Sequence, residues 1–478
     1  MPHHITEETL AMAQGILATG PRSFRTGEPP PPGMKAIDIA TGLYGYSLEA
    51  PAKKLYPVED GMRRRIPRWR NPVGAPFTHW KKIVGINKKK LRAGVPEGMV
   101  NKYIQLDTKE AFAKYKTLNM AGNLSQEAQV FSRQFEDSTA LNMLTALQSL
   151  MEQEDISIIG GCWTSLNPAM QAATVDVTNG DGSTGDVPAG SYVVKVSALT
   201  LQGFYAEAQG RVTDDEGVTA NSDGETTAKA AASFASTGGS MNVVWTDIPG
   251  AFGYNVYVND KWAMRVSTNR ATILEIPADG TPPNTADTSV DDLGYQGIME
   301  QLLIPGSNAY YKSMEGGTLT SDGAGGIKEI EDMFARIWDN WASGPTVIVC
   351  NSQEQQTIKK LTIGSSSVNA SRVIISTGEK DDFKAGAAVS AYLNQNTNQF
   401  VKIMNSRHMP PGRMMLLGEN VPYANSEVPN NFEIDLQMEY FGRERPQIDR
   451  SQSVDVTCIG AVKVYLGGIC GVLTNVGA

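Results

Sequence analysis

Apolar residues recur at helical spacing in one long stretch of the chain. Between about Ser125 and Glu154 they fall at positions 130, 131, 135, 141, 144, 147 and 151, close to the 3.6-residue period of an amphipathic helix. The spacing predicts a single helix of about 45 Å. Gly160-Gly161 is expected to stop it. A helix of this length would be a structural spine.

Shorter elements are expected on either side of this helix. The capping-box spacing of Asp107-Thr108-Lys109-Glu110 predicts a short helix that ends at Ala121-Gly122-Asn123. A second amphipathic helix is predicted from about Ile327 to Trp341, followed by a buried strand over residues 346–350. Asn351 can cap a further helix that runs to about Leu361.

From about Ala172 to Val290 the pattern changes to short alternating runs separated by Gly, Ser, Thr and Asp. This predicts an inserted all-β sandwich. Its fourteen acidic and six basic residues give it a charge of −8. Apolar strands return from Val454 to Leu473. Strands and helices without regular βαβ alternation indicate an α+β fold for the rest of the chain.

The first fifty residues show little pattern. A short helix is predicted from Glu7 to Leu17, and the proline run Pro29–Pro32 favours an extended conformation. This segment is expected to be an arm rather than a domain. At 478 residues the chain is too long to fold around a single hydrophobic core, so two or three domains are expected.

Charge is unevenly distributed along the chain. Residues 51–92 carry thirteen basic and two acidic side chains, a net charge of +11, whereas the whole chain carries −9 and the remainder therefore −20. We call residues 51–92 the basic strip. Such a strip on an acidic body indicates a surface that meets another surface.

The local sequence leaves two interpretations of the basic strip open. Basic residues interleaved with Trp69 and Trp80 could bind a phosphate backbone. The same strip contains turn signals and prolines that forbid a helix, and residues 80–86 resemble a strand, so it could also be an extended hairpin that lies on a neighbouring subunit.

The sequence offers no catalytic or metal-binding motif. Four cysteines stand far apart and are expected to be reduced and mostly buried. The loop 319–327 is rich in glycine but lacks phosphate-loop spacing, and His408 has no nucleophile motif beside it. We expect no active site, no metal and no cofactor, and therefore no enzyme. No apolar stretch is long enough for a membrane helix, so no membrane partner is expected.

Three stretches of the chain have distinctive amino-acid sequences. They are FEDSTALNMLTALQSLMEQEDISIIGG (135–161), residues 319–351 with LTSDGAGGIKEIEDMFARIWDNW and TVIVCN, and HMPPGRMMLLGENVPYANSEVPN (408–430), together 83 of the 478 residues. In the sequences of these three stretches and in the order of its elements, the chain resembles the major capsid proteins of tailed bacteriophages, which have the Hong Kong 97-type fold.

The resemblance implies a division of the chain. Residues 1–50 would be an N-terminal arm, 51–92 the E-loop, and 351–440 the axial domain. The peripheral domain with its spine helix would comprise 93–170, 291–350 and 441–478. The inserted residues 171–290 resemble an immunoglobulin-like or fibronectin-like module, with Trp245 as its buried tryptophan.

The resemblance also assigns a role to the basic strip, as an arm that docks on a neighbouring subunit. The expected contact residues are Arg63, Arg64, Arg65, Arg68, Trp69, Arg70, Trp80, Lys81, Lys82, Lys88, Lys89 and Lys90. The expected acidic partners on the neighbour's spine helix are Glu127, Glu136, Asp137, Glu152, Glu154 and Asp155.

Several partners follow from the resemblance. The chain would assemble with itself as hexamers and pentamers into an icosahedral virion shell, made in the host bacterial cytoplasm. A separate scaffolding protein, a portal and packaged double-stranded DNA on the inner face are expected. The inserted module could bind a decoration protein or host glycans. The alternatives are the shell of an encapsulin-like cellular nanocompartment and, with less support, a nucleic-acid-binding protein.

Overall fold

The structure is a computed structural model of the chain. It describes the following residues: 61–71, 74–86, 94–100, 106–127, 129, 138–205, 211–213, 219–221, 224–278, 280–289, 294–323, 325–363, 389–422, 428–445 and 451–477. The predicted helix over residues 7–17 and the proline run therefore lie outside the described residues.

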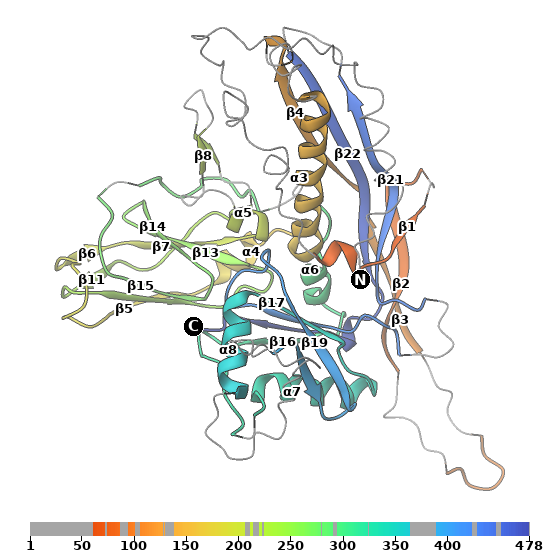
Figure 1. Cartoon of the computed structure of the whole chain (residues 1–478). Coiled ribbons are helices and arrows are strands. Elements are labelled where there is room, and N and C mark those ends of the chain that lie inside the picture. The colour runs from red at the N-terminus through yellow and green to blue at the C-terminus, as the bar shows by residue number, and fades with distance from the viewer. Residues whose placement is uncertain are drawn as a thin grey trace, which may run out of the picture.

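A long mixed sheet with one helix along it forms the upper part of the molecule in Figure 1. The strand order is β1-β21-β22-β4. The strands are β1 (Arg68–Arg70), β21 (Phe432–Glu444), β22 (Ser451–Val464) and β4 (Lys116–Ser125), and the helix is α3 (Ser138–Gly160). The predicted spine helix is confirmed over this range. Its end at two glycines is explained by close packing, because a Cβ at Gly161 would collide with the Tyr295 carbonyl oxygen.

A six-stranded mixed sheet forms the lower body, in the order β16-β23-β20-β17-β19-β18. Its strands are β16 (Tyr310–Ser313), β17 (Val347–Cys350), β18 (Ala391–Asn394), β19 (Gln399–Asn405), β20 (Met414–Leu417) and β23 (Gly471–Thr474). Two helices, α7 (Lys328–Trp341) and α8 (Ser352–Ile363), lie beside it. Both helices agree with the sequence prediction, and the Asn351 side chain caps α8 by accepting from the Gln353 amide at 3.0 Å.

The inserted segment folds as a β-sandwich, as its alternating pattern predicts. One sheet has the order β10-β7-β13-β14 and the other β15-β12-β5, with a further pair β11-β6. Buried side chains from both sheets form one cluster, in which Trp245 packs edge-on against Tyr254 at 5.1 Å. The strands are β5 (Val175–Asn179), β6 (Gly190–Tyr192), β7 (Val194–Leu199), β10 (Lys229–Ala230), β11 (Phe234–Ser236), β12 (Met241–Trp245), β13 (Gly253–Val258), β14 (Lys261–Val266) and β15 (Arg270–Ile273). A separate pair joins β8 (Arg211–Thr213) and β9 (Thr219–Asn221).

The sandwich is joined to the body through a buried arginine. Arg413 is 1% exposed and donates to the carbonyl oxygens of Ala251 and Ser267 in the sandwich, at 2.9 and 2.5 Å. Asp247 of the sandwich accepts hydrogen bonds from Tyr311 and Asn475 of the body. The sandwich is therefore held against the body by specific polar contacts rather than by its chain connections alone.

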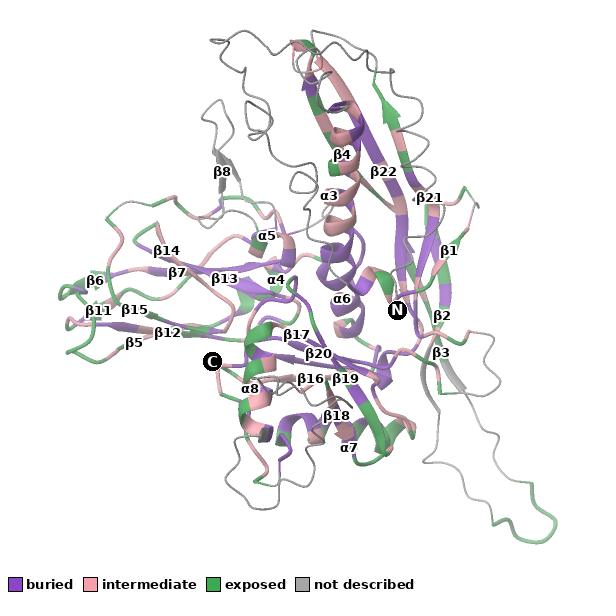
Figure 2. Ribbon diagram, in the orientation of Figure 1, coloured by how far each residue is buried: buried purple, intermediate pink, exposed green. Residues whose placement is uncertain are grey.

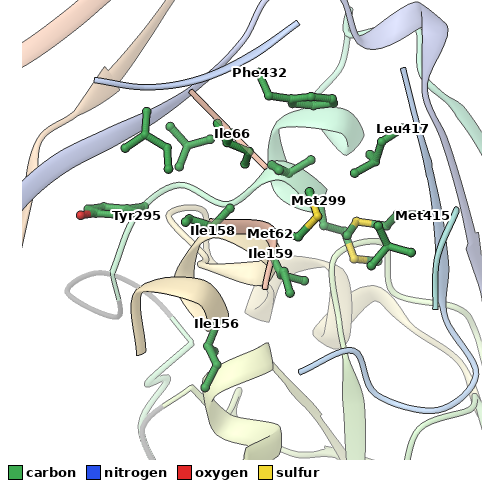
Figure 3. Close-up of a cluster of buried hydrophobic side chains, with 14 of the residues drawn as sticks. Met62, Ile66, Ile156, Ile158, Ile159, Tyr295, Met299, Met415, Leu417 and Phe432 are labelled. Atoms are coloured by element: carbon green, nitrogen blue, oxygen red, sulfur yellow. The ribbon is translucent and has the colours of Figure 1, made fainter. Parts of the chain in front are cut away.

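The largest core cluster lies where the long sheet, α3 and the six-stranded sheet meet. Figure 3 shows Met62, Ile158, Ile159 and Tyr295 in the same cluster as Met415 and Leu417. The short helix α6 (Ile298–Leu303) contributes Met299. All four cysteines are free and buried, as predicted.

A two-stranded hairpin extends from the long sheet. Its strands are β2 (Phe77–Ile86) and β3 (Leu106–Lys114), and they pair with each other in a sheet of their own. The strand predicted at residues 80–86 is thus confirmed. Among the described residues, two other helices are short, α4 (Asn167–Ala172) and α5 (Leu201–Tyr205), as are two 3-10 turns, η2 (Met62–Arg64) and η4 (Gly467–Ile469).

Two predictions of local structure are wrong. The expected helix at Asp107–Glu110 is strand β3, because its pairing with β2 outweighs a local capping signal. The residues expected to end that helix lie inside β4, which pairs with β22 over its whole length. Residues 126, 127 and 129 are helical directly after β4, and α3 ends at Gly160, as predicted for the spine helix, whereas residues 128 and 130–137 lie outside the described residues.

The boundaries predicted for the axial domain do not match the sheets. The boundary between residues 350 and 351 separates β17 from its partners β19 and β20. The boundary between 440 and 441 falls inside β21. Parallel pairing of β17 with β19 brings together segments that lie far apart in the sequence, which no local pattern reveals.

Candidate subunit interface at the basic strip

The first described part of the basic strip, residues 61–71, is bound to the spine helix of its own chain, and we call this part the root. The Nε atom of Arg63 lies 2.9 Å from Glu154 Oε2, and a guanidinium nitrogen of Arg68 lies 2.5 Å from the same oxygen. The Glu154 side chain is fully buried. Tyr440 donates its hydroxyl proton to Glu154, and both guanidinium groups lie over its ring. One buried carboxylate thus balances two arginines.

The electrostatics of this cluster follow from burial and charge. Burial lowers the pKa of the Arg68 guanidinium, but the carboxylate of Glu154 outweighs burial and raises that pKa overall. Burial, and then the same carboxylate, raise the pKa of the Tyr440 hydroxyl well above its ordinary range. Arg68 therefore stays charged and Tyr440 stays neutral at any physiological pH.

Neighbouring contacts extend the root. The Asp155 carboxylate accepts from the Arg63 amide at 2.8 Å and lies 3.9 Å from the buried His408 ring. Arg65 forms a bidentate pair with Glu419 at 2.7 and 2.9 Å. Arg407 pairs with Glu152. His408, expected to be structural, is part of this packed cluster.

These contacts differ from the prediction for the root. Arg63 and Arg68 were expected to meet the spine acids of a neighbouring subunit, but they meet Glu154 within one chain. The cause is geometric, since β1 adds as a parallel strand to β21 and places the root beside the C-terminal half of α3. Pairing of these arginines with Glu154 was expected, but between two chains rather than within one.

The base of the hairpin is fixed by a second buried carboxylate. Asp435 of β21 accepts from Thr78 at 2.8 Å and from Tyr115 at 2.9 Å. The Lys463 ammonium lies 2.7 Å from the same carboxylate. No local pattern in the sequence indicates this site, because its members come from four separated segments.

Trp80 is also held inside its own chain, contrary to the expected burial by a neighbour. It is 8% exposed, packs with Ala113 and Ala461, and donates its indole N–H to the Val464 carbonyl at 2.9 Å. Trp69, in contrast, is 64% exposed, and a contact of Trp69 with a second chain stays a prediction.

Beyond its base the hairpin presents an aromatic row to solvent. Phe112 is 52% exposed and packs edge-on with Phe77 and with Trp163, at 6.1 and 5.5 Å between ring centroids. A cavity of about 810 Å³ opens beside this row. It lies between β3, the segment after α3, and α6, and its lining is mainly apolar, with Phe252, Leu303, Ile304 and Pro305 at its walls.

Charged groups at this cavity come chiefly from the hairpin. Lys82 of β2 and Lys109 of β3 line it and stand directly opposite each other in the ladder. The Lys82 ammonium lies 5.7 Å from the centre of the Trp80 ring, and burial lowers its pKa to about 8. Glu300 of α6 accepts from the amides of Trp163 and Thr164, and burial raises its pKa.

The remaining predicted contact residues fall into two groups. Arg64, Arg70 and Lys81 are exposed, and Glu127 is half-buried. Lys88, Lys89, Lys90, Glu136 and Asp137 lie outside the described residues, so their roles stay predictions.

Metal and membrane sites were also sought. In the described ranges no group of three or more His, Cys, Asp or Glu side chains is placed to hold a metal ion. Within those same ranges no helix is both long and apolar enough to cross a membrane.

Comparison with known proteins gives structural similarities only. No protein-family model matches the chain, and no curated protein matches it in sequence. The capsid of Myoviridae phage XM1 is 10% identical over 93% of this chain and 100% of its own, with a TM-score of 0.38. The capsid of an empty GTA particle is 9% identical over 92% and 96%, with a TM-score of 0.39. The SrpI encapsulin of Synechococcus elongatus is 10% identical over 90% and 96%, with a TM-score of 0.35. These scores and identities are low, so none of the three decides the function of this chain.

Proposed function

We propose that this chain is the subunit of a self-assembling protein shell, with the organisation of a Hong Kong 97-type capsid protein. The observation that carries the proposal is the β2–β3 hairpin. It pairs with no other strand among the described residues, and a two-stranded hairpin alone is marginally stable in water. Its open edges and its exposed aromatic row need a further surface.

Two features of the rest of the chain support the same proposal. The element order (basic strip, spine helix, inserted sandwich, second helix, closing α+β region) agrees with the order that the resemblance implies. The three stretches that carry the resemblance, residues 135–161, 319–351 and 408–430, fall on α3, on α7 with β17, and on the segment around β20. These elements are central to the body.

The finer role that we propose is the head shell of a tailed bacteriophage, with a double-stranded DNA genome inside. The inserted sandwich would be immunoglobulin-like and would project outward, where a decoration protein or a glycan could reach it. Scaffold and portal would be separate proteins. The alternative is the shell of a cellular nanocompartment, in which the acidic inserted sandwich has no expected role.

Sedimentation velocity and negative-stain electron microscopy of the purified full chain test the shell. We expect discrete hexamers and pentamers or closed particles of uniform size at neutral pH. A chain that stays monomeric at every concentration would overturn the proposal. Particles from the native source are expected to protect double-stranded DNA from nuclease, and particles filled with a protein cargo would favour the nanocompartment instead.

A further inference from the structure

The cavity beside the base of the hairpin is large enough for a small organic molecule. Its volume of about 810 Å³ lies in the range of ligand-binding clefts, and its walls include Phe252, Leu303, Ile304 and Pro305. Figure 2 shows the last turns of α3 and most of α6 as buried, with β2 and β3 to one side of them. The cavity therefore lies between the hairpin and the buried core, and its apolar lining favours an apolar occupant over water.

Two lysines place positive charge at the hairpin side of this cavity. Lys82 and Lys109, which we call the lysine pair, stand directly opposite each other in the ladder, so their side chains share one face of the hairpin. The Lys109 ammonium reaches the turn after α6, where a Cβ at Gly306 would lie 3.0 Å from its nitrogen. No ion pair of either lysine occurs among the described residues. Like charges at two such positions are unfavourable unless an anion lies between them.

The carboxylates that line the cavity are engaged elsewhere. Glu300 accepts hydrogen bonds from the amides of Trp163 and Thr164 at 2.8 and 2.7 Å. Glu110 stands opposite Lys81, one position along both strands from the lysine pair, and therefore on the other face of the hairpin. The two ammonium groups of the lysine pair are thus available to an anion from outside the chain.

We propose that this cavity binds a small amphipathic carboxylate, a molecule with an apolar body and a single anionic head. The apolar body lies against Phe252 and Leu303, and the carboxylate lies between the two ammonium groups of the lysine pair. The inference goes beyond the proposed function, because the site is complete within one chain and needs no second subunit.

The two parts of such a ligand act together. Water screens an isolated ion pair at a partly exposed site, so a small anion alone gains little there. An apolar chain without a negative charge leaves the lysine pair without its counter-charge. One molecule that carries both parts removes apolar surface from water and neutralises the like charges at once.

Isothermal titration calorimetry of the purified full chain with three probes tests the site. Decanoate carries both parts of the ligand, acetate carries the head alone, and decylammonium carries the same chain with a positive head. We expect one decanoate per subunit, bound at least about tenfold more tightly than either of the other probes.

Variants of the cavity locate the binding. Lys82→Met/Lys109→Met keeps the apolar stems of the lysine pair and removes its charge, so it should weaken decanoate binding at least about tenfold. Lys81→Met/Lys114→Met changes the charge of the same hairpin equally at residues that do not line the cavity, and this matched control should bind decanoate like the wild type. Ala169→Trp fills the cavity from an exposed position of α4 and should abolish binding.

The outcomes separate this site from the shell, because sedimentation of the same samples records assembly independently. Equal affinities for decanoate and decylammonium would overturn the site and leave the shell standing, as would binding that the lysine-pair variant or Ala169→Trp leaves unchanged. Monomeric subunits that bind decanoate as expected would support the site and overturn the shell. Retention on duplex DNA that is lost in Lys82→Met/Lys109→Met, with no decanoate bound, would assign the lysine pair to nucleic acid and overturn the site.

Discussion

The two ends of the basic strip differ in how their charges are satisfied. At the root, Arg63, Arg65 and Arg68 pair with carboxylates of their own chain, and the central carboxylate is fully buried. Along the hairpin, Lys82 and Lys109 oppose each other without an acidic partner among the described residues, and Val95, Met99 and Val100 in the turn beyond them are exposed. A single run of positive charge in the sequence thus has two physical roles.

The difference shows which charges can join subunits. A buried arginine whose carboxylate is already in place gains nothing from a neighbour. An unpaired lysine beside an apolar recess gains both an ion pair and apolar contact. The root therefore fixes the position of the hairpin, and the far part of the hairpin is free to bind.

The largest expected effect is at the root. Glu154→Gln leaves Arg63 and Arg68 without their buried counter-charge, so we expect a loss of about 3–5 kcal/mol in the free energy of unfolding. Guanidinium denaturation of the isolated subunit measures it. Glu152→Gln, on the same helix but partly exposed, is the control and is expected to cost less than about 1 kcal/mol. Equal losses in the two variants would contradict the role given to Glu154.

A smaller effect is expected at the edge of the root. Arg65 and Glu419 form a bidentate pair whose side chains are 24% and 31% exposed. Solvent screens such a pair, so Arg65→Ala should lower the free energy of unfolding by about 1 kcal/mol. A loss as large as that of Glu154→Gln in the same denaturation assay would show that exposure does not distinguish the two sites.

The pH dependence of folding should reveal the unpaired lysine. The pKa of Lys82 is lower in the folded subunit than in the unfolded chain, which therefore binds more protons between about pH 8 and about pH 10. Stability of the isolated subunit should rise with pH across this window, and Lys82→Met should remove that rise. The other charged groups that line the same cavity are Lys109, Glu110 and Glu300, and both proteins retain them. Identical pH profiles for the two proteins would contradict the unpaired state of Lys82.

The smallest effect on folding is expected at the turn. Met99 is 70% exposed, so Met99→Ser should change the free energy of unfolding by less than about 0.5 kcal/mol. The same variant should weaken assembly, because a large apolar side chain at the end of the hairpin is no longer available to a neighbouring subunit. Assembly at wild-type concentrations, measured by light scattering, would show that the turn does not contribute to assembly.

Elements with a strong local period could be predicted from the sequence. The helix α7, the inserted sandwich and the Asn351 cap depend on residues close together in the chain, and they were found where expected. The strand β3 was missed, because only its pairing with β2 distinguishes it from the short helix that its capping box favours.

The candidate site could be predicted only in part. The count of basic residues identified the strip, and the turn signals indicated a hairpin. Glu154 was among the acids expected on the spine helix, but on that of a neighbouring chain. Asp435 and Glu419 could not be predicted, because long-range strand pairing brings them to the strip. The cavity could not be predicted from the sequence either, because its walls come from the hairpin, the segment after α3, the sandwich and α6.

Assembly of the purified full chain tests the central claim, docking of the hairpin on another subunit, most directly. Replacing the exposed Phe112 of the hairpin by serine should weaken assembly at least about tenfold in sedimentation velocity, equivalent to about 1.4 kcal/mol. Phe112→Ser subunits that assemble like the wild type, or a wild-type chain that stays monomeric, would contradict the account.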